Sequence, residues 1–89
     1  MSTYRYSPEV LDELARHGLM PLPSTTPRQL RDAVLDLYKY EIKVLKERLL
    51  RGAFERREYA ARVIGLRRRY PLLSLPLELW TTDAAPDDA

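Results

Sequence analysis

The stretch that most constrains the fold is residues 26–52, whose pattern predicts a single long amphipathic helix. Thr26 is a good N-cap residue, Pro27 falls at the first helical position, and Gln29 stands where the third residue of a capping box belongs. Gly52 supplies a left-handed residue at the other end. Between these signals apolar side chains recur at steps of three and four, without an internal Gly or Pro. At about 1.5 Å per residue, such a helix would be about 37 Å long.

The apolar face of this helix is wider than one neighbouring helix can cover. On a helical wheel the apolar side chains span an arc of about 220°, whereas a single packing surface needs a stripe only somewhat wider than about 100°. A chain of 89 residues has a modest core, and oligomerisation commonly stabilises proteins of this size. We therefore expect a homo-oligomer, with a dimer favoured, although the first helix or the C-terminal segment could also supply the cover. The expected interface residues are Leu30, Val34, Leu37, Glu41, Val44 and Arg48.

Two charged residues, Glu41 and Arg48, fall within this apolar arc. They lie two turns apart on one face, too far along the helix for an i, i+4 pair. A buried charge needs a partner or water, because an unpaired one is prohibitively costly. One hypothesis pairs Glu41 of one chain with Arg48 of a second across an antiparallel twofold axis. The alternative is that both long side chains reach the rim of the apolar face and are solvated there.

A shorter helix is predicted before the long one, and a third helix after it. Ser7 is the expected N-cap of the first helix, Pro8 its first residue, and Gly18 its end. The third helix is expected over residues 55–70, ended by Pro71 and folded back antiparallel to the long helix. These three helices predict an all-α fold with a helical hairpin, a single domain over residues 1–80.

The start of the third helix carries its own local signals. With Glu55 at the N-cap, Phe54 and Tyr59 are spaced as the two members of a hydrophobic staple, which favours a tight turn. Gly65 lies inside the helix and weakens it by about 1 kcal/mol relative to Ala. Either this cost is tolerated, or a neighbouring backbone approaches the helix at Gly65.

The segment 71–80 is apolar but contains two prolines, which forbid a regular helix or a central strand. It is expected to form an extended arm that either docks on a partner protein or covers the core of its own chain. Residues 81–89 are small and acidic, and we expect them to be a disordered tail. The expected docking residues are Leu73, Leu75, Leu77, Leu79 and Trp80.

The net charge of +2 conceals a strong segregation of charge. Residues 39–70 hold eleven Lys and Arg against four Asp and Glu, a net charge of +7, and the rest of the chain has a net charge of −5. A basic hairpin suits an anionic partner, or its charge is screened by the acidic tail. Nucleic-acid binding by the hairpin, residues 48–69, is therefore the alternative function. Its expected contact residues are Arg56, Arg57, Arg62, Arg68 and Arg69.

The residues around the turn also form a recognisable pattern. A Leu-rich helix end at Leu45, Leu49 and Leu50 leads into Gly52-Ala53-Phe54, and Glu58-Tyr59 and Leu66 follow. This pattern resembles the short helical hairpin called SHOCT, which is found in many bacterial proteins. In that family a Thr or Ser caps the second helix, whereas Glu55 stands here, and this hairpin lies in the middle of the chain. The resemblance covers about a quarter of the chain and implies oligomerisation or partner binding without catalysis.

The sequence offers little for catalysis, cofactors or membrane insertion. It has no cysteine and a single histidine, and it contains neither a Gly-rich phosphate loop nor a cluster with the spacing of metal ligands. No apolar run approaches the length of a membrane span, and the N-terminus lacks the apolar region of a signal peptide. We therefore expect a cytoplasmic, non-enzymatic helical interaction or oligomerisation module without cofactors, such as a small accessory subunit of a larger complex.

Overall fold

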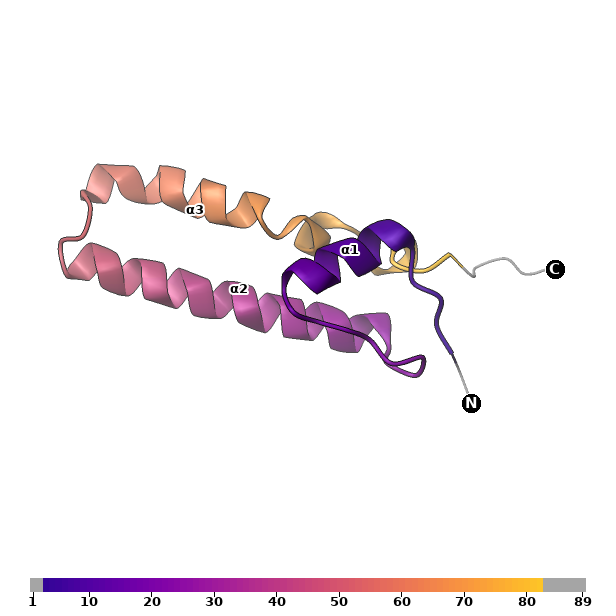
Figure 1. The fold of residues 1–89 in the computed structure, drawn as a ribbon. Helices are drawn as coiled ribbons and strands as arrows, with labels where there is room; N and C mark the ends of the chain where they lie inside the picture. Colours follow the sequence, from indigo (N-terminus) through magenta and orange to yellow (C-terminus); the bar gives the residue numbers. More distant parts are fainter. Residues whose placement is uncertain (1–2, 83–89) are drawn as a thin grey trace.

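The computed structural model describes residues 3–82 and confirms the all-α fold class. The helices α2 and α3 form an antiparallel hairpin, and α1 lies over the N-terminal half of α2 (Figure 1). The described residues also form three short 3₁₀ helices, one before α3 and two after it. The elements in order are α1 (Pro8–Arg16), α2 (Pro27–Leu50), η1 (Arg56–Glu58), α3 (Tyr59–Arg68), η2 (Pro71–Ser74) and η3 (Leu77–Leu79). The molecule is elongated, with principal extents of 56, 19 and 16 Å.

The predicted start and end of the long helix are confirmed. The Thr26 hydroxyl accepts a hydrogen bond from the Gln29 backbone N–H at 3.1 Å, and the Gln29 side chain accepts one from the Thr26 N–H at 2.9 Å. This reciprocal pair is a capping box. Gly52 follows the helix with a φ of 81°, a left-handed conformation that glycine adopts without strain. Local chemistry therefore determines both ends of α2.

The first helix is also bounded as predicted. The Ser7 hydroxyl accepts a hydrogen bond from the Val10 N–H at 3.2 Å, which caps the N-terminus of α1. At the other end Gly18 has a φ of 75°, and the Leu19 N–H donates to the Leu14 carbonyl at 2.9 Å. This hydrogen bond closes the turn in the manner of a Schellman motif.

The third helix begins later than predicted. The residues before Tyr59 form the 3₁₀ turn η1, in which the Glu58 N–H donates to the Glu55 carbonyl at 2.9 Å. Glu55 makes no capping hydrogen bond, and its carboxylate pairs instead with the Arg57 guanidinium at 2.6 Å. Without a side-chain cap, the first turn tightens into i to i+3 hydrogen bonding.

The core lies at one end of the molecule. Its buried side chains come from the N-terminus, α1, the first half of α2, the end of α3 and the segment that follows α3. By contrast, no residue between 35 and 65 is buried. The outer part of the hairpin therefore projects from the core (Figure 1). The core residues are Tyr6, Val10, Leu14, Leu30, Val34, Leu66, Tyr70, Leu72 and Trp80.

The C-terminal segment is not the extended arm that its prolines suggested. Pro71 occupies the first position of η2, and Pro76 directly precedes η3 at its N-cap position, because proline fits the start of a helical turn as well as an extended path. Trp80 is fully buried in the chain's own core, and its indole N–H donates to the Leu75 carbonyl at 3.0 Å. Trp80 is therefore part of the core and is not exposed for docking on a partner.

The two ends of the described chain are held together. Tyr6 and Thr81 form an isolated antiparallel bridge, and the Thr82 N–H donates to the Arg5 carbonyl at 2.8 Å. The Tyr6 hydroxyl also donates to the Thr25 carbonyl. The first two residues of the predicted tail therefore contact the N-terminal segment, the remainder, residues 83–89, lies outside the described residues, and the disordered tail stays a prediction.

None of the helices within residues 3–82 combines the length and the apolar character needed to cross a membrane.

Candidate functional site

The six residues predicted to form an oligomer interface divide into two groups. Leu30 and Val34 are 6% and 0% exposed, because α1 and the segment 71–80 close the core over them. These two residues are therefore corrected from interface to intrachain core. Leu37 is half-buried and packs against the core as well, whereas Glu41 and Val44 are half-buried without belonging to it, and Arg48 is exposed. The part of the predicted interface that stays accessible thus lies along the second half of α2.

Glu41 has partners within its own chain, so its charge does not depend on the predicted pairing with Arg48 of a second copy, which stays a hypothesis. Its carboxylate accepts a hydrogen bond from the Tyr70 hydroxyl, and Arg69 Nη2 lies 3.4 Å from Glu41 Oε1. Burial of the ring, and then the hydrogen bond to Glu41, raise the pKa of Tyr70 to about 12. Glu41 thus ties α2 to the end of α3.

His17 lies against this same tyrosine. The rings of His17 and Tyr70 stack with centroids 4.3 Å apart and planes 10° apart, and Tyr38 contacts Tyr70 edge-on at 5.5 Å. The Nε2 atom of His17 is buried and has no hydrogen-bond partner among the described residues. In the sequence His17 is only the single histidine, placed just before Gly18 at the expected end of the first helix. The sequence carried no signal for this stack, since 53 positions separate His17 from Tyr70.

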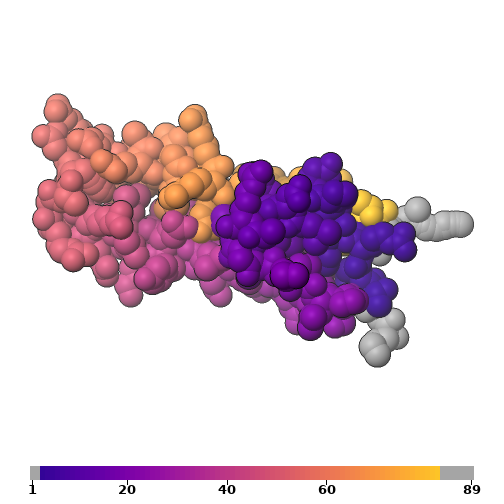
Figure 2. All heavy atoms as spheres, in the orientation of Figure 1, coloured from indigo at the N-terminus to yellow at the C-terminus, as the bar shows by residue number. Residues whose placement is uncertain are grey.

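A groove runs between α2 and α3 where the hairpin leaves the core, and we call it the hairpin groove. It encloses about 520 Å³. Its floor is apolar, and three arginines stand along its rim with one glutamate. Figure 2 shows a hollow between the two helices beside α1. The lining residues are Tyr40, Glu41, Val44, Leu45, Arg48, Arg62, Gly65, Leu66 and Arg69.

The arginines on the rim of the groove are only weakly held by their own chain. Arg62 lies 3.3 Å from a Glu58 carboxylate oxygen, and its guanidinium lies 4.3 Å from the centre of the Phe54 ring. Both members of this ion pair are about half exposed, and such pairs contribute little in water. Arg48 is exposed. These arginines can therefore turn toward an anionic group without a large loss of intrachain stability.

A second recess adjoins the hairpin groove on the side of α1. It encloses about 400 Å³, and Glu41 and Arg69 line both recesses. Glu13, Arg16 and His17 line it from the end of α1. The groove and α1 are therefore neighbours on one side of the hairpin.

The predicted docking residues of the C-terminal segment mostly cover their own chain. Leu73, Leu75 and Leu77 are half-buried and pack against the core, as does the fully buried Trp80. Leu79 alone of the five is largely exposed. The segment 71–80 thus serves as core cover within one chain.

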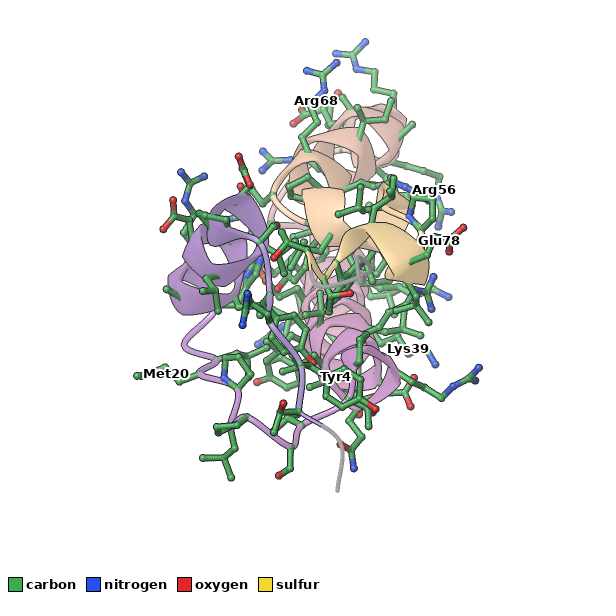
Figure 3. All side chains as sticks on the ribbon, turned by 90° about the vertical axis from the view of Figure 1, so that its right-hand side faces the viewer. Tyr4, Met20, Lys39, Arg56, Arg68 and Glu78 are labelled. Atoms are coloured by element: carbon green, nitrogen blue, oxygen red, sulfur yellow. The ribbon has the colours of Figure 1, made fainter. Side chains whose placement is uncertain are left out.

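The predicted nucleic-acid contacts are not gathered into one patch. Arg56 belongs to η1 at the tip of the hairpin, whereas Arg68 closes α3 near the core. Their positions differ by twelve, which corresponds to about 18 Å along a helix. Figure 3, which looks along the molecule from its right-hand side, shows Arg56 and Arg68 directed to different sides. Of the other three arginines, Arg57 is exposed at the tip, and Arg62 and Arg69 line the hairpin groove.

Within residues 3–82 no group of three His, Cys, Asp or Glu side chains is placed to hold a metal ion. Comparisons with models of known protein families, with curated proteins and with solved structures found no match to this chain. The relationship to SHOCT hairpins therefore stays a prediction from the sequence around the turn.

Proposed function

We propose that this chain is a non-enzymatic, cytoplasmic interaction module whose projecting hairpin associates with a second copy to form a dimer. The observation that carries the proposal is the one-sided core. Every buried residue within 3–82 belongs to the core at one end of the molecule, while residues 35–65 contain none. More than half of α2 is therefore only partly covered by its own chain.

The outer hairpin carries apolar side chains that its two helices do not shield. Tyr40, Leu50 and Ile64 are 66%, 72% and 53% exposed, and Val44 and Leu45 are half-buried along the groove. Complete burial of one such side chain contributes about 1.5–3 kcal/mol. Helical proteins bury faces of this kind against a further helix, which a second copy of the chain would supply.

The third helix also needs packing in order to be stable. α3 has ten residues, one of which is glycine, and an isolated helix shorter than about 12–15 residues is marginal in water. Of its residues only Leu66 is buried. A second copy placed against the hairpin would therefore stabilise α3 as well as α2.

Sedimentation velocity over a range of protein concentrations tests the proposal. The wild-type chain should shift from monomer to dimer as its concentration rises, and Val44→Asn should shift the equilibrium toward monomer. Lys43→Asn is the matched control, because it places the same side chain one residue away at an exposed position. A wild-type chain that stays monomeric at every concentration would contradict the proposal.

Nucleic-acid binding by the hairpin is the second candidate function, favoured by the net charge of +7 over residues 39–70. Electrophoretic shifts at low salt that disappear as salt rises would support it, because phosphate contacts depend strongly on salt. Absence of a shift at low salt would contradict nucleic-acid binding.

A further inference from the structure

The charge of the hairpin restricts what can lie in the hairpin groove. Residues 39–70 carry a net charge of +7, so two hairpins placed side by side along their length would repel each other. Along the groove, Arg48, Arg62 and Arg69 face a single acidic residue, Glu41. A partner surface that is acidic and partly apolar would match both the rim and the floor.

The outer face of α1 is such a surface. Asp12 is exposed at its centre, with exposed Glu9 on one flank and Leu11, a large apolar residue that is 41% exposed, on the other. Arg16, one turn from Asp12, is also exposed, and its guanidinium lies 3.3 Å from the Glu13 carboxylate of the same helix. Val10 and Leu14, on the inner face, hold the helix on the core. α1 is therefore a short helix fixed to the surface, with acidic side chains and a leucine left for a neighbour.

The dimensions of α1 and the groove agree. α1 has nine residues and is about 13 Å long. The α2 wall of the groove runs from Tyr40 to Arg48, which is about 12 Å of helix. Figure 2 shows α1 standing forward of the hairpin, with the hollow between α2 and α3 beside it. α1 and the hairpin groove thus lie next to each other on one side of the molecule.

The glycine at position 65 supports the idea that a helix of a second copy approaches α3 at the groove. It lies inside α3, where it lowers helix stability by about 1 kcal/mol relative to Ala, and it lines the groove. A Cβ atom built at this position would meet nothing within 4 Å of its own chain. No intrachain contact therefore requires a glycine, whereas a helix lying in the groove would come close to the backbone there.

We propose that two copies of this chain dock reciprocally, with the outer face of α1 of each copy seated in the hairpin groove of the other. A twofold axis perpendicular to the long axis, passing between α1 and the groove, makes both contacts at once. Asp12 of one copy then faces Arg48 of the other, and Leu11 meets the apolar floor. This arrangement rests on the proposed self-association and specifies its interface.

Charge reversal in the full chain, measured by sedimentation equilibrium, tests the docking. Asp12→Arg alone and Arg48→Asp alone should each weaken the dimer by at least about tenfold in Kd. The double variant should recover the wild-type Kd to within about threefold, because the opposite charges again face each other. Rising salt should weaken the wild-type dimer, whereas an interface held only by apolar burial would not weaken.

Two variants with the same charge changes serve as controls. Lys46→Asp alters an exposed cation on α2, two residues from Arg48, that does not line the groove. Glu78→Arg alters an exposed carboxylate on the side of the molecule away from α1 (Figure 3). Both should change the Kd by less than about twofold, as substitutions outside an interface do. Circular dichroism of each variant checks that its helices are retained.

Gly65→Leu is an independent variant that carries no charge. Its side chain would fill the groove while the monomer keeps its fold, since the space at Gly65 is open, and the dimer should be lost. A wild-type dimer that is unaffected by Asp12→Arg, Arg48→Asp and Gly65→Leu would overturn the docking and leave the self-association standing. A wild-type chain that is monomeric throughout would overturn both.

Discussion

The hydroxyl of Tyr70, just beyond the end of α3, donates a hydrogen bond to the carboxylate of Glu41 in the middle of α2. Arg69 approaches the same carboxylate, and His17 at the end of α1 stacks on the Tyr70 ring. One tyrosine therefore joins all three helices at the point where the hairpin leaves the core. This junction fixes how the hairpin groove is placed relative to α1.

Removal of the Tyr70 hydroxyl should weaken this junction. We expect Tyr70→Phe to lower the free energy of unfolding by about 1–2 kcal/mol, because a hydrogen bond to a charged carboxylate is lost while the buried ring remains. Urea denaturation followed by circular dichroism measures the change. Tyr40→Phe is the control, since the Tyr40 side chain is largely exposed, and it should change stability by less than about 0.5 kcal/mol. Equal losses in the two variants would show that the contact with Glu41 is not stabilising.

Stability should fall in alkaline solution because of two buried tyrosines. Burial raises the pKa of Tyr6 and of Tyr70 from 10.0 to about 12. The fold thus favours the protonated hydroxyls. Their contribution is fully present below pH 10 and is lost as the pH rises from 10 to 12, because the unfolded chain releases these protons first. Urea midpoints measured across this range for the wild type and for the double variant Tyr6→Phe, Tyr70→Phe isolate the effect. The double variant should lose less stability, and an identical loss would contradict the prediction.

Caps and helix ends could be predicted from the sequence because they depend on residues within a few positions. Thr26 with Gln29, Ser7 with Val10, and Gly52 each act on the turn that contains them. The structure therefore bears out the boundaries of α1 and α2. α3 starts later than expected, since Glu55 is not among the residue types that cap well and its side chain makes no capping hydrogen bond.

Contacts between distant residues could not be predicted in this way. The sequence marked Glu41 as a charge needing a partner, but no local rule could select Tyr70 and Arg69, 29 and 28 positions away. The same limit applies to the cover over Leu30 and Val34, which α1 and the segment 71–80 supply. Of the candidate site, Val44 and Arg48 are accessible, as an interface requires, and their role in an interface stays a prediction, whereas the role proposed for the outer face of α1 emerged only from the structure.

A single substitution should measure how much the capping box of α2 contributes to the stability of the fold. Thr26→Ala removes the acceptor for the Gln29 N–H and should lower the free energy of unfolding by about 1 kcal/mol. Ser24→Ala is the control, because Ser24 is exposed in the preceding loop and lies outside the helix. Thermal unfolding should show a lower midpoint for Thr26→Ala and an unchanged one for Ser24→Ala. Equal midpoints for the two variants would mean that the cap does not limit stability.

Gly65 provides a test of whether the monomer itself needs a glycine inside α3. Gly65→Ala should raise the free energy of unfolding by about 0.5–1 kcal/mol, because alanine has the higher helix propensity and its Cβ would meet no atom of the chain within 4 Å. Denaturation must be measured at protein concentrations where the chain is monomeric, so that any effect on self-association is excluded. Gly52→Ala is the matched comparison and should lower stability by about 1 kcal/mol, since its φ of 81° strains any residue with a Cβ. A loss of monomer stability in Gly65→Ala would show that the glycine serves the packing of α3 within its own chain, and the groove would then not be the reason for it.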